Sequence, residues 1–180
     1  MKIGDAEYVA ENIDVVRRNY KNRRFRKRHP QFQIVLPFIS GSRKILSVGG
    51  GAVEPSVIKA THLIDIAPNA GELARFMKWK GYFKVGSSTD IPAPDKYFDV
   101  AVCREVLEHL PTLDDVKKTL HELDRVAKKW IATTPAYPLG PKNPERTHKR
   151  FLDLETLKRL SPKDNVEVLK IGGYNYVKKT

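Results

Sequence analysis

The sequence has little cysteine and no long apolar run, and each absence excludes a class of protein. Its 180 residues contain one cysteine, Cys103, which excludes an internal disulfide and a cysteine-rich metal site. No apolar run approaches the roughly 18 residues that a membrane-spanning helix needs. The N-terminus, "MKIGDAEYVAEN", is polar and acidic and does not resemble a signal peptide. We therefore expect a cytoplasmic protein without a transmembrane segment.

Negative charge is also scarce relative to positive charge. The chain has 33 Lys and Arg residues against 21 Asp and Glu residues, which gives a formal net charge of +12. Eight of the basic residues lie in "RRNYKNRRFRKRH", residues 17–29. Such a run predicts an anionic partner, which can be nucleic acid, a phosphate group or an acidic membrane surface. The alternative is a solvated helix face.

Hydrophobic periodicity separates an N-terminal segment from the rest of the chain. Four apolar residues before the basic run have helical spacing, namely Val9, Ile13, Val16 and Tyr20. After the run, "HPQFQIVLPFI" predicts a second, short helix that Pro37 ends or kinks. We expect residues 1–42 to form a basic helical cover.

Residues 43–180 show apolar strands that alternate with amphipathic helices. This alternation predicts a parallel sheet with helices on both faces. One helix, "LDDVKKTLHELDRVAKK", has an apolar stripe formed by Val116, Leu120, Leu123 and Ala127. The closing "VEVLKIGGYNYVKK" predicts a hairpin with a Gly-Gly turn, which adds an antiparallel strand. Residues 1–180 are thus expected to form a single α/β domain with 43–180 as its core.

A glycine-rich turn follows the first predicted strand. In "ILSVGGGAVEP" a strand leads into three glycines and then into a helix that starts near Pro55. Glycines let the backbone approach a ligand closely, and a helix N-terminus favours negative charge. Asp65 ends the next predicted strand, where a carboxylate can accept hydrogen bonds from both ribose hydroxyls. The alternative is a tight turn with a surface aspartate.

The spacing in this region does not fit a dinucleotide cofactor. Val53 lies near the place of the third fingerprint glycine. Only 14 residues separate Gly51 from Asp65, where the dinucleotide fingerprint has about 20. A nicotinamide-dependent oxidoreductase is therefore disfavoured, and a cofactor with one nucleoside and no pyrophosphate fits better.

Four segments taken in order resemble the class I S-adenosylmethionine-dependent methyltransferases: "KILSVGGG", "LIDIAP", "VGSSTDIPAPDKYFDVAVCREVLEHLP" and "WIATTP". The resemblance covers residues 43 to about 160. It implies a Rossmann-like, doubly wound sheet of about seven strands with strand 7 antiparallel, and S-adenosylmethionine as the methyl donor. It also implies that the methionine part of the cofactor lies over the glycine turn, that Asp65 binds the ribose and that Ile66 flanks the adenine. The cofactor-binding residues implied are Gly49, Gly50, Gly51, Asp65, Ile66, Ser87 and Ser88.

Three residues depart from the pattern of this family. Ser47 replaces the acidic residue that usually precedes the glycine turn, and Val53 replaces a glycine that lets the first helix pack closely. Ser87 replaces an adenine-contacting aspartate. These changes leave open an alternative function, a non-catalytic nucleic-acid-binding protein that has kept the fold.

The segment "CREVLEHL" contains two carboxylates and an imidazole directly after a predicted buried strand. In a helix, Glu105, Glu108 and His109 would share one face, because they are spaced at i, i+3 and i+4. The segment is similar to ubiquinone-pathway O-methyltransferases and to small-RNA 3′-end 2′-O-methyltransferases. That similarity implies a divalent metal, and His148 matches a second histidine in the RNA group. The implied ligands are Glu105, Glu108, His109 and His148, which suit Mg²⁺, Mn²⁺, Fe²⁺ or Zn²⁺.

The expected reaction is methyl transfer to a hydroxyl, with His109, His148 and Glu105 as catalytic residues. A bound metal would lower the pKa of the hydroxyl. In the metal-free alternative the cluster lines the substrate pocket, and one histidine acts as general base because its pKa lies near seven. Arg104 is then a candidate partner for Glu105. Substrate contacts are expected from the N-terminal helices and from "PAYPLGPKNPERTH", which contains Tyr137.

Overall fold

The computed structural model describes residues 29–136 and 148–180. The helix predicted around residues 9–20, all of the basic run except His29, and Tyr137 lie outside the described residues.

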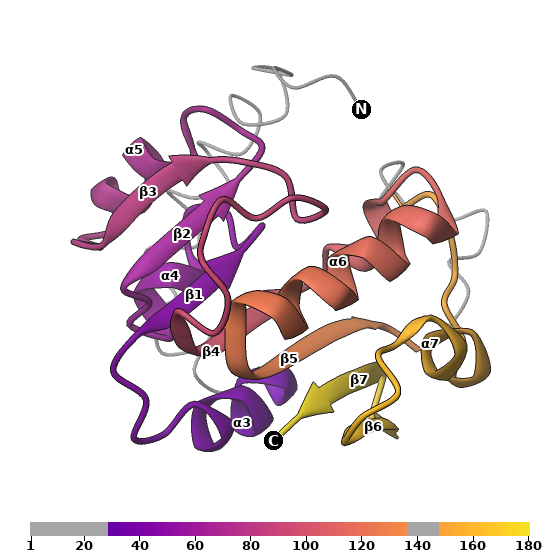
Figure 1. The fold of residues 1–180 in the computed structure, drawn as a ribbon. Coiled ribbons are helices and arrows are strands. Elements are labelled where there is room, and N and C mark those ends of the chain that lie inside the picture. The colour runs from indigo at the N-terminus through magenta and orange to yellow at the C-terminus, as the bar shows by residue number, and fades with distance from the viewer. Residues whose placement is uncertain (1–28, 137–147) are drawn as a thin grey trace.

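The described chain forms one seven-stranded sheet with the strand order β3-β2-β1-β4-β5-β7-β6 (Figure 1). Strands β1, β2, β3, β4 and β5 pair in parallel, and β7 is antiparallel to both β5 and β6. The predicted doubly wound sheet with an antiparallel seventh strand is confirmed. The strands are β1 (Ile45–Val48), β2 (His62–Asp65), β3 (Tyr82–Val85), β4 (Phe98–Arg104), β5 (Ala127–Pro135), β6 (Val166–Ile171) and β7 (Tyr174–Lys179).

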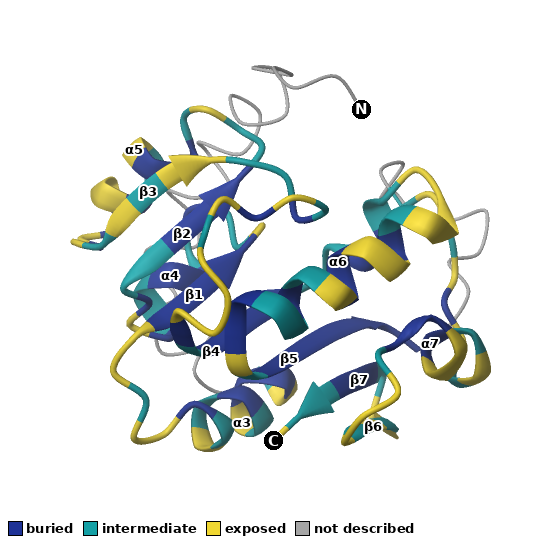
Figure 2. Cartoon of the chain, viewed as in Figure 1, coloured by how far each residue is buried: buried dark blue, intermediate teal, exposed yellow. Residues whose placement is uncertain are grey.

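Helices cover both faces of this sheet. They are α3 (Pro30–Phe38), α4 (Glu54–Val57), α5 (Ala70–Phe76), the 3₁₀ helix η1 (Leu107–His109), α6 (Leu113–Val126) and α7 (Leu154–Leu160). One core lies between the sheet and the helices α6 and α7, where Leu120 and Leu157 pack with Trp130. A second core lies on the other face, where α3 contributes Phe32 and Val35. The middle strands are therefore buried, and the edge strands β3 and β6 are more exposed (Figure 2).

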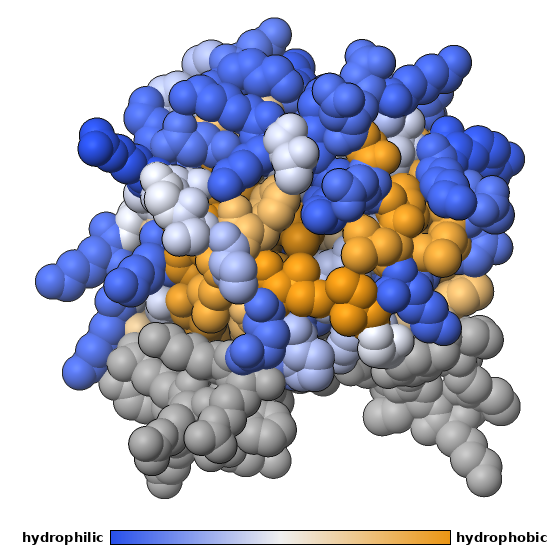
Figure 3. All heavy atoms as spheres, turned by 90° about the horizontal axis from the view of Figure 1, so that it is seen from below, coloured by the Kyte–Doolittle hydropathy of each residue, from blue (hydrophilic) through white to orange (hydrophobic). Residues whose placement is uncertain are grey.

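Helix α3 packs a short apolar segment against the sheet. Pro37 lies in its last turn and the helix ends one residue later, as the sequence predicts. Lys129 of β5 donates a hydrogen bond to the Phe38 carbonyl over 2.7 Å, which fixes this end to the sheet. Seen from below, the side on which α3 lies in Figure 1, the surface carries an apolar area beside hydrophilic residues (Figure 3).

Helix α6 begins with a capping box. The Thr112 hydroxyl accepts a hydrogen bond from the Asp115 amide, and the Asp115 carboxylate accepts one from the Thr112 amide, each over 3.0 Å. The helix buries Val116, Leu120 and Leu123, as its apolar stripe predicts. The prediction was wrong at the end of the stripe. Ala127 is extended and opens β5, because it pairs with β4 opposite Phe98.

The described helices include none that is both long and apolar enough to cross a membrane.

Candidate active site at the carboxyl ends of the strands

The three glycines form the turn between β1 and α4. Gly49 and Gly51 have φ angles of 63° and 54°, in the left-handed region that favours glycine. The Gly49 amide donates to the Ile64 carbonyl over 2.8 Å, which joins the turn to β2. A Cβ atom on Gly50 would lie 2.1 Å from the Ser47 hydroxyl oxygen. Gly50 therefore has to be a glycine, because a side chain there would clash with the protein, whereas a Cβ atom on Gly51 would meet nothing within 4 Å.

Asp65 lies at the end of β2, beside the glycine turn. Its carboxylate accepts hydrogen bonds from the Gly51 amide over 3.1 Å and from the Ala67 amide over 3.0 Å. Burial raises the pKa of Asp65, and these backbone amides oppose the shift. The structure thus brings Asp65 and the glycine turn together, as the sequence analysis expects. Ile66 follows it and is half-buried.

The two predicted serines follow β3 and have different surroundings. The Ser87 hydroxyl lies 2.7 Å from the Thr89 hydroxyl, and Ser87 is half-buried. Ser88 is buried, and its hydroxyl lies 2.9 Å from that of Thr119 in α6. The Ser88 side chain therefore holds α6 against this loop, and Ser87 is the better placed of the two to meet a ligand.

A buried ion pair lies under the glycine turn, and the sequence analysis missed it. Glu54 is 4% exposed, and its carboxylate accepts hydrogen bonds from the Ser47 hydroxyl and from Arg104 Nε, each over 2.8 Å. Burial raises the pKa of Glu54, while Arg104 and Ser47 oppose the shift. Arg104, which the sequence suggests as a partner for Glu105, thus pairs with Glu54. The sequence feature that could have indicated this ion pair is a glutamate three residues after the last glycine of the turn.

Glu105 does not share a helical face with Glu108 and His109, and this prediction was wrong. The helix η1 begins only at Leu107, and Glu105 has a left-handed φ of 54°. Its carboxylate accepts hydrogen bonds from Gln31 Nε2 over 2.6 Å and from the Thr133 hydroxyl over 3.0 Å. The reversal of the backbone directs this side chain toward α3 and β5.

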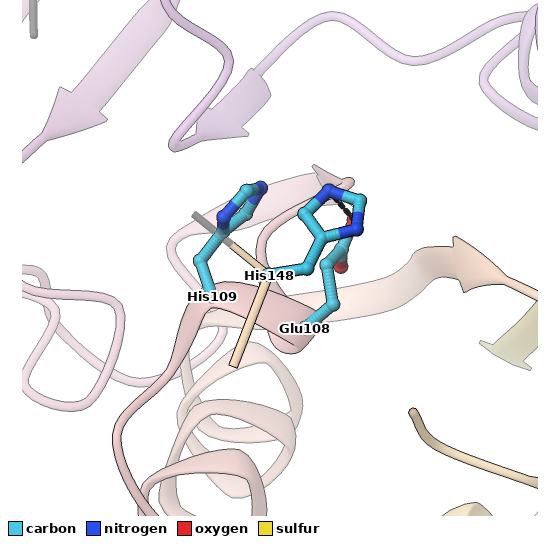
Figure 4. A group of neighbouring side chains, drawn as sticks. All are labelled: Glu108, His109 and His148. Atoms are coloured by element: carbon cyan, nitrogen blue, oxygen red, sulfur yellow. Dashed lines mark ion pairs between the residues drawn. The ribbon is translucent and has the colours of Figure 1, made fainter. Parts of the chain in front are cut away.

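The structure brings together the other three predicted ligands. Glu108, His109 and His148 each offer an atom, and these atoms lie within 4.8 Å of one another (Figure 4). The Glu108 side chain is 1% exposed, and its Oε1 lies 4.0 Å from His148 Nε2. The two imidazole rings meet edge to face with their centroids 4.6 Å apart. One carboxylate and two imidazoles suit a divalent transition metal.

Backbone contacts fix His148 beside η1. The Lys149 amide donates to the Glu108 carbonyl over 2.8 Å, and Arg150 Nε donates to the Leu110 carbonyl over 3.0 Å. A second nitrogen of Arg150 donates to the Pro111 carbonyl. Protein contacts therefore hold the segment of His148 beside Glu108 and His109.

Residues 46–130 match a protein-family model described as a methyltransferase domain. This segment carries a methyltransferase domain, and the sheet around it has the strand order of the class I methyltransferase fold. The predicted methyltransferase domain is therefore confirmed. Among curated proteins, none matches the sequence of the chain.

Solved structures share the fold of this methyltransferase at low sequence identity. An S-adenosylmethionine-dependent methyltransferase from Thermotoga maritima is 16% identical with a TM-score of 0.68, and the match covers 97% of this chain and 95% of the other. The methyltransferase in a complex with the Trm112 activator from Haloferax volcanii is 14% identical with a TM-score of 0.68 over 94% and 96%. A Pyrococcus horikoshii protein is 18% identical with a TM-score of 0.66 over 86% and 88%.

The residues around the glycine turn fit S-adenosylmethionine, the methyl donor that the sequence resemblance implies. The glycine turn leaves open space at Gly51, where a Cβ atom would meet nothing within 4 Å, and Asp65 provides a carboxylate beside it. Ser47 replaces the usual acidic residue, but a carboxylate is still present at this place, because the Ser47 hydroxyl donates a hydrogen bond to Glu54. Val53 stands where the family usually has a glycine that lets the first helix pack closely. In this chain that helix, α4, has only four residues.

Proposed function

We propose that this methyltransferase transfers the methyl group of S-adenosylmethionine to a hydroxyl oxygen, with a divalent metal held by Glu108, His109 and His148. One observation carries the proposal. The segment that leads into this cluster packs against the glycine turn, because a Cβ atom on Gly49 would lie 2.6 Å from a methyl carbon of Val106, two residues before Glu108. The donor and the activated acceptor would thus meet at the carboxyl ends of β1 and β4.

The chemistry explains why an acceptor hydroxyl would need such a cluster. Methyl transfer is an in-line displacement, in which the bond from sulfur to carbon breaks while a bond from oxygen to carbon forms. The positively charged sulfur leaves readily, but a neutral hydroxyl is a weak nucleophile that must lose its proton. A bound divalent metal would lower the pKa of that hydroxyl. Glu108, His109 and His148 would hold the ion and so orient the acceptor oxygen.

The donor would bind along the glycine turn. In this arrangement Gly49, Gly50 and Gly51 pass along the methionine part, and Asp65 accepts hydrogen bonds from the ribose hydroxyls. Ile66 would flank the adenine, with Ser87 near it. The hydrogen bond from the Gly51 amide to Asp65 supports this placement, because it holds the predicted ribose-binding carboxylate directly beside the glycine turn.

A metal-free reaction uses the same three side chains differently. His109 or His148 would then accept the proton of the acceptor hydroxyl, and Glu108 would orient His148 across their 4.0 Å separation. Glu105 belongs to neither arrangement, because its carboxylate binds Gln31 and Thr133. The net charge of +12 further supports an anionic acceptor or partner that residues 17–29 would bind.

Metal binding can be measured without knowing the acceptor. Calorimetric titration of the full chain with Mn²⁺ or Zn²⁺ should show saturable binding. His148→Ala should weaken it at least tenfold, because loss of one of three ligands removes more than about 1.4 kcal/mol. His121→Ala is the matched control, since His121 lies exposed on α6 and should not affect binding.

Methyl transfer from labelled S-adenosylmethionine to pools of RNA and of hydroxylated small molecules then tests the reaction. Chelator should abolish transfer, and added Mn²⁺ should restore it. Binding that His148→Ala leaves unchanged, or full transfer in excess chelator, would contradict metal assistance. Transfer to amines alone would contradict a hydroxyl acceptor.

A further inference from the structure

Arg104 has a guanidinium nitrogen that its contacts with the described residues do not use. Its Nε donates to Glu54 over 2.8 Å, and its guanidinium carbon lies 4.0 Å above the centre of the Phe32 ring. Within the described residues, Arg104 Nη1 is buried and has no hydrogen-bond partner. The side chain as a whole is only 15% exposed. Arg104 therefore contacts Glu54 and Phe32, while its buried Nη1 donates no hydrogen bond to the described residues.

This guanidinium lies one ion pair away from the glycine turn. A Cβ atom on Gly50 would lie 2.9 Å from Glu54 Oε1, so the Glu54 carboxylate directly underlies the turn. Its other oxygen binds Arg104. Arg104 is also the last residue of β4, and the chain continues from it to Val106, which packs against Gly49. Two routes through the structure thus connect Arg104 with the segment that cradles the donor.

The chemistry of the unused donor indicates what it binds. A guanidinium stays charged at any ordinary pH, and a buried N–H without an acceptor destabilises the ligand-free protein. Glu54 has a raised pKa because of burial, and its carboxylate is already bound by Ser47 and Arg104. Among the described residues no protein acceptor meets Arg104 Nη1, so a ligand can supply the acceptor. Carboxylates are the strongest such acceptors for arginine, and S-adenosylmethionine carries one at its amino-acid end.

We propose that Arg104 is a cofactor-binding residue whose Nη1 donates a hydrogen bond to the carboxylate of the methionine part of S-adenosylmethionine. Glu54 and Phe32 are positioning residues that fix the guanidinium. The proposal rests on the placement of the methionine part over the glycine turn. Helix α3 would then contribute to donor binding indirectly, because its Phe32 ring packs against the Arg104 guanidinium.

Paired ligands test the proposal by calorimetry on the full chain. S-adenosylhomocysteine contains the amino-acid end, and 5′-methylthioadenosine lacks it. Arg104→Met should weaken S-adenosylhomocysteine binding about ten- to hundredfold, since a charge-assisted hydrogen bond is lost. Binding of 5′-methylthioadenosine should change less than about twofold, because that ligand has no carboxylate. The control Arg159→Met replaces an exposed arginine of α7 and should change neither affinity.

Removal of Arg104 alone leaves the buried Glu54 without its cation, and the variant can be unstable for that reason. The double variant Glu54→Gln with Arg104→Met removes both charges and should show the same selective loss. Equal weakening of both ligands, or unchanged S-adenosylhomocysteine binding, would overturn the role of Arg104 while leaving the cofactor site in place. Failure of the unaltered protein to bind either ligand would overturn the cofactor site and this proposal together.

Discussion

At the scale of single residues, the Asp65 carboxylate combines an observed structural role with a predicted role in cofactor binding. It accepts the Gly51 and Ala67 amides, and it is the predicted acceptor for the ribose hydroxyls. The sequence predicts this position because an aspartate at the end of the second strand follows a glycine turn. It did not predict Glu54, because a glutamate near the start of a helix is normally exposed. Only the folded arrangement shows Arg104 beside it.

Asp65→Ala should weaken S-adenosylhomocysteine binding by about 1–3 kcal/mol, because a charged acceptor for two hydroxyls is lost. Calorimetry measures this directly. Asp65→Asn keeps an oxygen that can accept the Gly51 amide, so it separates the loss of charge from a collapse of the turn. Asp164→Ala, at an exposed position after α7, is the control. Unchanged affinity in Asp65→Ala would show that another residue binds the ribose.

At the scale of elements, the turn after β4 shows where sequence patterns stop being sufficient. The apolar run "FDVAV" correctly predicts the strand, but β4 continues to Arg104. Glu105 then takes a left-handed conformation, which bulky side chains adopt rarely and which no periodicity indicates. The Gln31 and Thr133 contacts to Glu105 come from distant parts of the chain. Three of the four predicted ligands, Glu108, His109 and His148, nevertheless lie together. Two of them are sequence neighbours in η1, and the resemblance to small-RNA methyltransferases indicates His148.

The capping box of α6 should contribute measurably to the stability of this element. Thr112→Ala removes the hydroxyl that accepts the Asp115 amide, and it should lower the free energy of unfolding by about 1 kcal/mol. Chemical denaturation provides the measurement. Lys118→Ala is the comparison, because its pair with Asp114 is exposed and should matter much less. Equal effects of the two substitutions would mean that the cap does not stabilise the helix.

At the scale of the whole molecule, the alternation of strands and helices was enough to predict the sheet. Parallel strands place their carboxyl ends at one edge, so the glycine turn, Asp65 and the segment after β4 meet there even though they are distant in sequence. The edges of the sheet follow from the same order, with β3 at one side and the closing hairpin at the other. The acceptor is not determined by this topology, because the fold serves many substrates. Charge is the remaining molecular property that indicates a partner.

The basic run at residues 17–29 should bind single-stranded nucleic acid with strong salt dependence. Neutralised phosphates release counterions, so the logarithm of the binding constant should fall with the logarithm of salt by about 0.7 per phosphate contacted. Fluorescence anisotropy with a labelled single strand of about 20 nucleotides measures this slope. Replacing Arg23, Arg24, Arg26 and Arg28 by serine should reduce both the affinity and the slope. A control with serine at Lys80, Lys84, Lys117 and Lys163 removes the same charge from exposed positions elsewhere and should retain most of the binding. If both variants lose affinity equally, the net charge of +12 acts as a whole and the run has no site of its own. If the unaltered protein does not bind even at low salt, these residues are a solvated surface.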